Sequence, residues 1–305
     1  MSGAMARTPD PIPDQHGRRF VITGANGGLG AEVTRVLVAH GASVVMACRD
    51  PRRGSDIAAR VGGDVTVAEL DLADLTAVAR FARQCGEFDV LINNAGLMNV
   101  PFARTADGFE TQFGVNHLGH FALTGLLLDR VRDRVVSLSS ISHGWTRSLP
   151  LDDLRFERRR YSRSAAYAES KLSTLMFGRE LQRRLDEHGS RLRSYVVHPG
   201  VSPTGLVAHT ETPLDYVAEP FIRLVGQSRA AAAQSILYAA TSPDADPHTY
   251  WGPTKLFNTR GAIGACPSSA LSRERSRWQQ LWEVSERATG IGFRIPAPGV
   301  SHEDR

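Results

Sequence analysis

Thr23-Gly24-Ala25-Asn26-Gly27-Gly28-Leu29-Gly30 is the stretch of sequence that decides the fold. A short apolar run that predicts a β-strand, Phe20–Thr23, leads into it, and apolar residues at helical spacing follow it over Gly30–His40. Glycines between a strand and a helix permit a tight turn and a close approach of the backbone to a pyrophosphate. The helix N-terminus then offers its free N–H groups to that phosphate. The stretch therefore predicts a dinucleotide-binding turn.

The alternation of strand and helix continues along the chain. Further strands are predicted at Ser43–Ala47, Val65–Glu69, Val90–Ile92, Val135–Leu138, Tyr195–His198 and Thr249–Trp251. Further helices are predicted at Arg53–Val61, Asp74–Cys85, Asp107–Val131, Ala165–Glu187, Ala230–Ala240 and Leu271–Thr289. Such alternation builds right-handed βαβ units and a mostly parallel sheet that helices cover on both faces. We expect a single α/β domain with a doubly wound sheet in three αβα layers.

The domain limits follow from where this pattern begins and ends. The domain is predicted over residues 18–290, with a flexible arm at 1–17 and a tail at 291–305. Three prolines interrupt residues 201–226, which follow a strand end, so this segment is predicted to be a mobile substrate flap. Because the flap carries several large apolar side chains, we expect an apolar and fairly bulky substrate.

The composition excludes several classes of protein. Of the 305 residues, 42% are hydrophobic and 22% are charged, as in an ordinary globular enzyme. The sequence shows no bilayer-spanning run, membrane anchor or signal peptide, so we expect a cytoplasmic protein. The net charge is +4, but the basic run Arg158–Arg160 has no interleaved aromatic residues, so no nucleic-acid partner is expected. The three cysteines are widely spaced and the histidines lack ligand spacing, so neither disulfides nor a metal site is predicted.

The end of the second predicted strand bears on the choice of cofactor. An acidic residue here binds the adenosine ribose hydroxyls in dinucleotide folds, whereas an arginine accepts a 2′-phosphate. The strand ends in Cys48 and is followed at once by Arg49, which favours NADP(H) over NAD(H). Asp50 leaves an alternative open, since its carboxylate could neutralise Arg49 or reach the ribose itself.

A tyrosine and a lysine at helical spacing carry the predicted chemistry. Tyr167 and Lys171 are four residues apart at the head of a predicted helix, which places both side chains on one face. A free phenol titrates near pH ~10, and a nearby ammonium lowers that pKa. A drop of roughly three units needs about 4 kcal/mol, which one close ammonium and a positively charged nicotinamide can supply together. Lysine is rare here, because Lys171 and Lys255 are the only two among 36 basic residues, so Lys171 indicates a need for a compact ammonium.

Taken with these residues, several motifs in order give the chain a family resemblance. The motifs are TGANGGLG (Thr23–Gly30), Asp71-Leu72, NNAG (Asn93–Gly96), Asn116, Ser139-Ser140, YAESK (Tyr167–Lys171) and HPG (His198–Gly200). The chain resembles the short-chain dehydrogenase/reductases, which implies a Rossmann-type fold. ACRD (Ala47–Asp50), GVNHLGHF (Gly114–Phe121), SKL (Ser170–Leu172) and LWEVSE (Leu281–Glu286) are similar to the retinol-dehydrogenase-like and protochlorophyllide-reductase-like branch.

The resemblance implies a role for each matching residue. Cofactor contacts are implied for Gly24, Asn26, Gly28, Leu29, Gly30, Arg49, Asp71, Leu72, Asn93, Ala95, Gly96, Tyr167, Lys171, Pro199, Gly200 and Thr204. Tyr167 would be the acid–base, Ser140 would hydrogen-bond the substrate oxygen, and Asn116 would organise a proton-relaying water. If the predicted end of the strand is wrong by one residue, Ser139 has this role in place of Ser140. Gly27 occupies a place where NADP(H) users of the family often carry a basic residue.

The predicted activity is hydride transfer between NADP(H) and a carbonyl or alcohol carbon. Two alternatives stay open: a non-catalytic NADP(H)-sensing or interaction protein on the same fold, and a light-dependent pigment reductase. A small-molecule substrate is the expected partner, and the long predicted helices at 107–131 and 165–187 offer a face for a homodimer.

Overall fold

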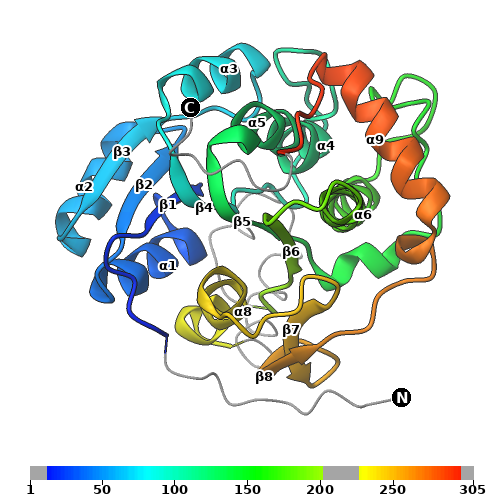
Figure 1. Ribbon diagram of the computed structural model, residues 1–305. Helices are drawn as coiled ribbons and strands as arrows, with labels where there is room; N and C mark the ends of the chain where they lie inside the picture. The colour runs from blue at the N-terminus through cyan, green and yellow to red at the C-terminus, as the bar shows by residue number, and fades with distance from the viewer. Residues whose placement is uncertain (1–11, 202–226, 297–305) are drawn as a thin grey trace.

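The computed structural model describes residues 12–201 and 227–296 of the chain (Figure 1). Its strands are β1 (Arg19–Thr23), β2 (Ser43–Cys48), β3 (Val65–Glu69), β4 (Phe88–Asn93), β5 (Val131–Leu138), β6 (Arg193–Val197), β7 (Tyr250–Lys255) and β8 (Arg260–Ala265). They form one sheet in the order β3-β2-β1-β4-β5-β6-β7-β8. Neighbours from β3 through β7 pair in parallel, and β8 pairs antiparallel with β7. The predicted α/β fold with a mostly parallel sheet is confirmed.

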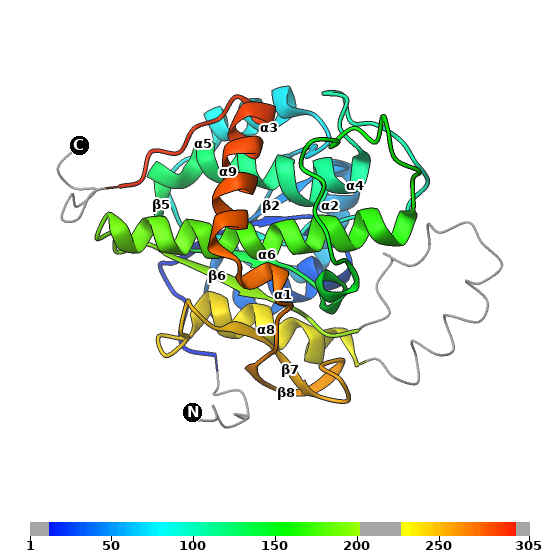
Figure 2. The same cartoon turned by 90° about the vertical axis from the view of Figure 1, so that its right-hand side faces the viewer.

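Helices cover both faces of this sheet. They are α1 (Gly28–Ala39), α2 (Pro51–Val61), α3 (Leu75–Gln84), α4 (Thr111–Phe113), α5 (His120–Leu127), α6 (Arg163–Glu187), α8 (Arg229–Thr241) and α9 (Arg275–Thr289). Helices α1 and α8 lie on one face, α3, α5 and α6 lie on the other, and α9 packs across the outside of α6 (Figures 1 and 2). The predicted three-layer arrangement is therefore present.

Strand β1 shows why the sequence buries both faces of the sheet. Successive side chains of a strand point to opposite faces. Phe20 and Ile22 belong to the core beneath α1 and α8, whereas Val21 belongs to the core beneath α5 and α6. A strand covered on both faces needs apolar residues at every position, and the continuous run from Phe20 to Ile22 meets that need.

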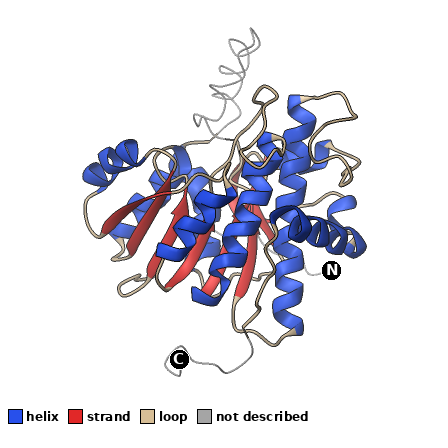
Figure 3. Ribbon diagram, turned by 90° about the horizontal axis from the view of Figure 1, so that it is seen from above, coloured by secondary structure: helices blue, strands red, loops and turns tan. Residues whose placement is uncertain are grey.

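The order of the strands places a crevice at the carboxyl edge of the sheet. From β1 the chain proceeds outward through β2 to β3, and it then returns to β4 on the other side of β1. Loops that leave β1 and β4 therefore diverge at their carboxyl ends, which is where open α/β sheets bind ligands. Figure 3 shows the strands and the covering helices from above.

The structure corrects the predicted long helix Asp107–Val131. The helix begins at α4, continues through a π-helical turn at Gly114–Gly119 into α5, and ends in a 3-10 turn before β5 begins at Val131. Glu110 caps its first turn, because its carboxylate accepts hydrogen bonds from the backbone N–H groups of Gln112 and Phe113. Periodicity alone joined these pieces because apolar residues continue through all of them.

Two further elements differ from the sequence prediction. Strand β8 was not predicted, because its sequence, Arg-Gly-Ala-Ile-Gly-Ala, has little β-branched or aromatic character. The predicted helix Leu271–Thr289 is a 3-10 turn at Leu271–Arg273 followed by α9.

Parts of the predicted arm and tail pack against the domain. Gln15 is buried and its backbone N–H donates to the carbonyl of His40 at 2.8 Å. At the other end, the Phe293 ring lies 4.4 Å from that of Trp282, centroid to centroid, within the core beneath α5 and α6. Residues 12–17 and 291–295 thus contribute contacts that composition did not indicate.

Candidate active site

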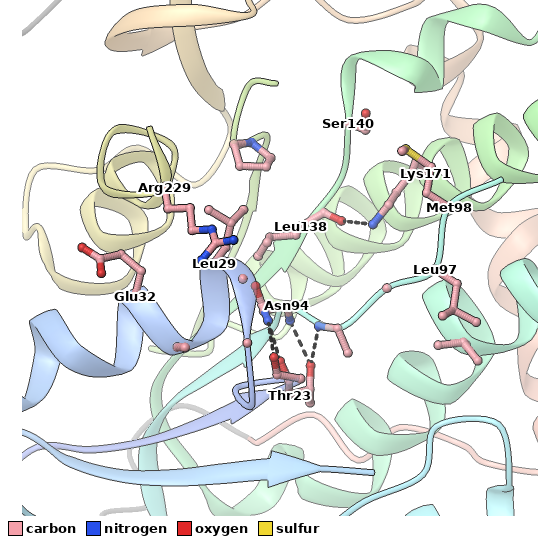
Figure 4. A pocket seen from close by; sticks show the side chains of 18 of the residues that line it. Thr23, Leu29, Glu32, Asn94, Leu97, Met98, Leu138, Ser140, Lys171 and Arg229 are labelled. Carbon is pink, nitrogen blue, oxygen red and sulfur yellow. Dashed lines mark hydrogen bonds between the residues drawn. The ribbon is translucent and has the colours of Figure 1, made fainter. Parts of the chain in front are cut away.

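A cavity of about 1610 Å³ lies along the carboxyl edge of the sheet. Its wall comes from the β1–α1 turn, the residues after β2 to β6, the start of α6 and the β7–β8 turn. Figure 4 shows a part of it, with Leu29 on α1, Ser140 after β5 and Lys171 on α6 among the lining residues. Pockets for a single drug-sized ligand are typically about 300–1,000 Å³, so this one has room for a dinucleotide and a second molecule.

The glycine turn can receive a pyrophosphate. Gly24 has φ of +64°, and a Cβ at this position would lie 2.9 Å from Ala95. A Cβ on Gly30 would lie 2.7 Å from the carbonyl oxygen of Gly24, so only glycine lets α1 approach the strand. The N-cap residue of α1, Gly27, has no side chain to satisfy the first N–H groups of the helix. These free donors and the positive end of the helix dipole fit a bound phosphate.

The ends of β1 and β4 are tied together next to this turn. The backbone N–H groups of Asn94 and Ala95 both donate to Thr23 Oγ1 at 2.9 Å. The Asn94 amide donates to the Thr23 carbonyl at 2.7 Å (Figure 4). Asn93 requires a correction: its side chain points into the core, where its amide donates to Thr124, and Asn94 lines the cavity instead. The motif lies at the strand end, where a shift of one residue reverses the direction of the side chain.

Several arginines line the part of the cavity formed by α2 and the residues after β2, which is the end where the adenosine of a bound dinucleotide would lie; Arg49 and Arg53 are two of them. Arg49 lines the wall, and within the described ranges it makes no ion pair. Asp50 is the N-cap of α2 and accepts from the backbone N–H of Arg53 at 3.1 Å. The guanidinium of Arg53 reaches the glycine turn, since a Cβ on Gly27 would lie 3.1 Å from one of its nitrogens. Arg53 therefore supplies a positive charge at the place where the sequence showed Gly27 and no basic residue.

The Tyr167 side chain faces serine hydroxyls at the end of β5. Burial raises the pKa of Tyr167, and hydrogen bonding to the Ser140 and Ser142 side chains opposes that rise. The Ser139 hydroxyl donates to the Lys171 carbonyl at 2.7 Å. Ser140 is therefore the member of the serine pair that meets the phenol, and Ser142 is an additional hydroxyl that the sequence did not single out.

Lys171 is 5% exposed and lies beside Tyr167. Its Nζ is 5.9 Å from the centre of the Tyr167 ring and donates to the Leu138 carbonyl at 2.9 Å (Figure 4). Burial lowers the pKa of Lys171 to about 8. The expected lowering of the Tyr167 pKa by this ammonium is not seen in the protein alone: burial raises the pKa, and the hydroxyls of Ser140 and Ser142 are what oppose the rise.

Asn116 lies in the π-helical turn behind the cavity wall. Its Oδ1 accepts from the Leu97 backbone N–H at 2.7 Å, and its Nδ2 donates to the Leu97 carbonyl and to Ser170 Oγ, both at 2.9 Å. These hydrogen bonds of Asn116 hold the loop after β4 against α6. Asn116 therefore positions the cavity wall. The predicted role of organising a water would require its carboxamide to line the cavity, and it does not.

Most of the predicted site residues line the cavity, and a few do not. The cavity wall contains Gly24, Asn26, Gly28, Leu29, Arg49, Asp71, Leu72, Ala95, Gly96, Ser140, Tyr167, Lys171, Pro199 and Gly200. Gly30 packs inside the turn, and Thr204 lies outside the described residues. Sequence reasoning missed Arg53, Asn94, Ser142, Trp145, Arg229 and Phe257, which also line the wall. A signal for Arg53 was present, since Asp50-Pro51 is a helix start that brings the third helical residue to the turn.

The described residues show no grouping of three or more His, Cys, Asp or Glu side chains suited to a metal ion. In the same part of the chain, no helix has both the length and the apolar character needed to cross a membrane.

Comparisons with known proteins agree with this geometry. The family model for short chain dehydrogenases matches residues 18–145. Retinol dehydrogenase 12 of Homo sapiens is 38% identical to the chain, and the match covers 95% of this chain and 91% of that protein. Polyprenol dehydrogenase of Danio rerio is 36% identical, with 93% and 90% covered. A solved structure of an uncharacterized protein from Mycobacterium Paratuberculosis has a TM-score of 0.83 at 43% identity, with 95% and 100% covered. The chain therefore belongs to the short-chain dehydrogenase/reductase family, in its retinol-dehydrogenase-like branch.

Proposed function

We propose that this protein is an NADP(H)-dependent oxidoreductase that interconverts the carbonyl and alcohol forms of an apolar, fairly bulky substrate. The observation that carries the proposal is the placement of Tyr167, Ser140 and Lys171 in one cavity with the phosphate-binding turn. A proton donor, a second hydrogen-bond donor and a nucleotide cradle in one cavity are the parts that carbonyl reduction requires.

The residues divide the chemistry between them. When bound, the nicotinamide cofactor supplies or accepts the hydride. The Tyr167 hydroxyl donates its proton to the substrate oxygen in the reducing direction, and the Ser140 hydroxyl donates a hydrogen bond to the same oxygen. Lys171, Pro199 and Gly200 would hold the nicotinamide end, since all three line the same cavity as Tyr167. Burial raises the pKa of Tyr167, so in the protein alone the phenol carries the proton that it would donate in the reducing direction.

The proposed preference for NADP(H) rests on Arg49 and Arg53 at the adenosine end. Arg49 and Arg53 present two planar guanidinium groups to one end of the cavity, and the Asp50 carboxylate is engaged in capping α2. Planar forks of this kind bind a phosphate bidentately.

Cofactor titration by fluorescence tests this preference. We expect wild-type protein to bind NADPH at least ~10-fold more tightly than NADH, a difference of about 1.4 kcal/mol. Arg49→Ala and Arg53→Ala should each reduce NADPH affinity and leave NADH affinity unchanged. Arg52→Ala is the matched control, because Arg52 is exposed on α2 and does not line the cavity. Equal affinity of the wild type for both cofactors contradicts the assignment.

Tyr167→Phe tests the proton donor. The variant should bind NADPH with wild-type affinity and lose at least ~100-fold in turnover, the usual contribution of a positioned acid. Retained turnover would show that another group donates the proton.

The substrate class follows from the reacting end of the cavity and from the relatives. Leu97, Met98 and Ile141 line the cavity beside Ser140 and Lys171 and make this end apolar. Two relatives are named for retinol and polyprenol, both of which are large apolar alcohols. We therefore propose a long-chain apolar aldehyde, ketone or alcohol as the substrate.

A further inference from the structure

Most of the exposed large apolar side chains line the active-site cavity. Within the described residues, the exposed ones are Phe102 (44%), Trp145 (66%), Leu256 (39%) and Phe257 (92%). Trp145, Leu256 and Phe257 all line the active-site cavity, and Phe102 does not. We call these three residues the apolar rim. Exposed apolar groups gathered at the wall of a cavity mark a binding surface rather than chance exposure.

The backbone that carries Phe257 is strained. The turn between β7 and β8 spans residues 256–259. Leu256, Phe257 and Asn258 have φ of 47°, 54° and 63°, so three consecutive residues that are not glycine adopt the left-handed region. Leucine and phenylalanine occupy this region at a cost, and such strain persists where the surrounding structure enforces it.

Hydrogen bonds within the hairpin enforce the strained turn. The Asn258 amide donates to the Pro253 carbonyl at 3.0 Å. The Thr259 hydroxyl donates to the Leu256 carbonyl at 2.7 Å, and the Thr259 backbone N–H donates to the Lys255 carbonyl at 3.2 Å. The polar residues of the turn are therefore engaged internally, and the Phe257 side chain projects outward.

The turn is also tied to the segment that would seat the nicotinamide. His198 accepts from the Gly200 N–H at Nδ1, 3.1 Å away, so its Nε2 carries the proton and donates to the Asn258 carbonyl at 2.6 Å. The Val201 N–H donates to the Thr259 carbonyl at 3.0 Å. A Cβ on Gly200 would lie 2.4 Å from the same Thr259 carbonyl oxygen. The position of Phe257 is thus fixed relative to Pro199 and Gly200.

We propose that Phe257 is a specificity-determining residue that contacts the apolar chain of the substrate beyond its reacting carbon and favours long substrates over short ones. Trp145, which follows β5 on the Ser140 side, provides a second contact of the same kind. The proposal rests on the proposed carbonyl reduction and adds the residues that select the substrate. It explains why a fully projecting phenylalanine is held on strained backbone at this place.

The test compares two straight-chain aldehydes, butanal and decanal, with NADPH as the reductant. In wild-type protein, kcat/KM should be higher for decanal. Phe257→Ala should lower the decanal-to-butanal ratio of kcat/KM about 10-fold, as expected for loss of one aromatic contact, and Trp145→Ala should act in the same direction. The NADPH dissociation constant and the butanal kcat/KM should stay unchanged. Phe102→Ala is the matched control, since it removes an exposed phenylalanine that does not line the cavity.

The outcomes separate the two proposals. A wild-type protein that reduces neither aldehyde overturns the proposed function, whereas a wild type that reduces both, with an unchanged ratio in Phe257→Ala, overturns only the role of Phe257. Phe257→Gly adds an independent readout. Glycine adopts positive φ freely, so this variant should unfold at a higher temperature than Phe257→Ala while losing the same preference for decanal. A lower unfolding temperature for Phe257→Gly than for Phe257→Ala contradicts strain at this residue.

Discussion

Lys171 shows how burial can set the chemistry of one residue. Its ammonium is surrounded by the protein, and burial lowers its pKa to about 8. Arginine in this place would keep its charge at any pH and would offer a broad fork in place of a compact donor. The retention of lysine in an arginine-rich chain agrees with this difference.

The lowered pKa predicts how activity depends on pH. As the pH rises through about 8, Lys171 loses its proton, so kcat/KM for NADPH should fall, by up to ~10-fold per pH unit. Lys171→Met should lower kcat/KM and abolish this fall. Lys255→Met is the control, since Lys255 is the other lysine of the chain and is exposed. A fall that persists unchanged in Lys171→Met assigns the titration to another group.

At this scale, residues at regular helical positions could be predicted and residues at strand ends could not. The spacing of Tyr167 and Lys171 fixes both on one face of α6, so the sequence alone brings them together. Asn93 and Asn94 are adjacent where β4 ends, and the sequence does not show which of them turns toward the cavity. Arg53 could have been found from the helix start at Asp50-Pro51, although its contact with the glycine turn also depends on the reach of its long side chain.

At the scale of elements, the β1–α1 turn depends on the absence of a side chain at Gly30. In an exposed helix, alanine in place of glycine stabilises by about 1 kcal/mol. In α1 the added Cβ would lie 2.7 Å from the Gly24 carbonyl oxygen and 2.8 Å from the Ala25 Cα, which cannot move aside without deforming the turn. The steric cost, roughly 1–3 kcal/mol, therefore outweighs the gain in helix propensity.

Gly30→Ala is accordingly expected to lower the free energy of unfolding and to weaken NADPH binding at least ~10-fold, because the turn must open. Urea unfolding and fluorescence titration measure the two effects. Gly86→Ala is the control, since a Cβ there meets nothing within 4 Å. Wild-type affinity for NADPH in Gly30→Ala would count against the close fit of α1 to the strand.

The π-helical turn at Gly114–Gly119 is the element that sequence periodicity missed. Within it, a Cβ on Gly119 would lie 2.4 Å from the Leu72 carbonyl oxygen, so the helix approaches the loop that forms the adenosine end of the cavity. The extra residue of a π turn also directs Asn116 toward Leu97. All residues of Gly114–Gly119 are buried, so no polar face is present on which a change of period would show.

At the scale of the whole molecule, the mostly parallel sheet and its two buried faces followed from the sequence, because alternation and continuous apolar runs specify a doubly wound sheet. The same close packing buries several histidines. Burial lowers the pKa of His117 to about 3, that of His120 to about 4 and that of His198 to about 4. All three are neutral in the folded protein at neutral pH.

These histidines predict a loss of stability in acid. In the unfolded chain each binds a proton below its ordinary pKa near ~6.5, whereas in the folded protein it does not until the pH falls to the lowered pKa. As the pH falls from ~6.5 to 5, each histidine therefore lowers the free energy of unfolding by up to about 2 kcal/mol. Urea unfolding at a series of pH values should show this slope, and His117→Phe should reduce it. His188→Phe, at an exposed histidine, is the control. An identical slope in His117→Phe would exclude His117 as a contributor.

Helix α6 links the reacting groups to a distant part of the protein. Tyr167 lies near its start, and Glu180, which binds Arg183 and Arg184, lies 13 residues further on, a separation of about 20 Å along the axis. Since the helix behaves as a stiff rod, a tilt of about 3° at its far end moves the phenol by roughly 1 Å, enough to lower a rate by orders of magnitude. Substitutions in the part of α6 that lies beneath α9 would therefore lower the catalytic rate by displacing Tyr167, although the residues that bind the nucleotide stay unchanged.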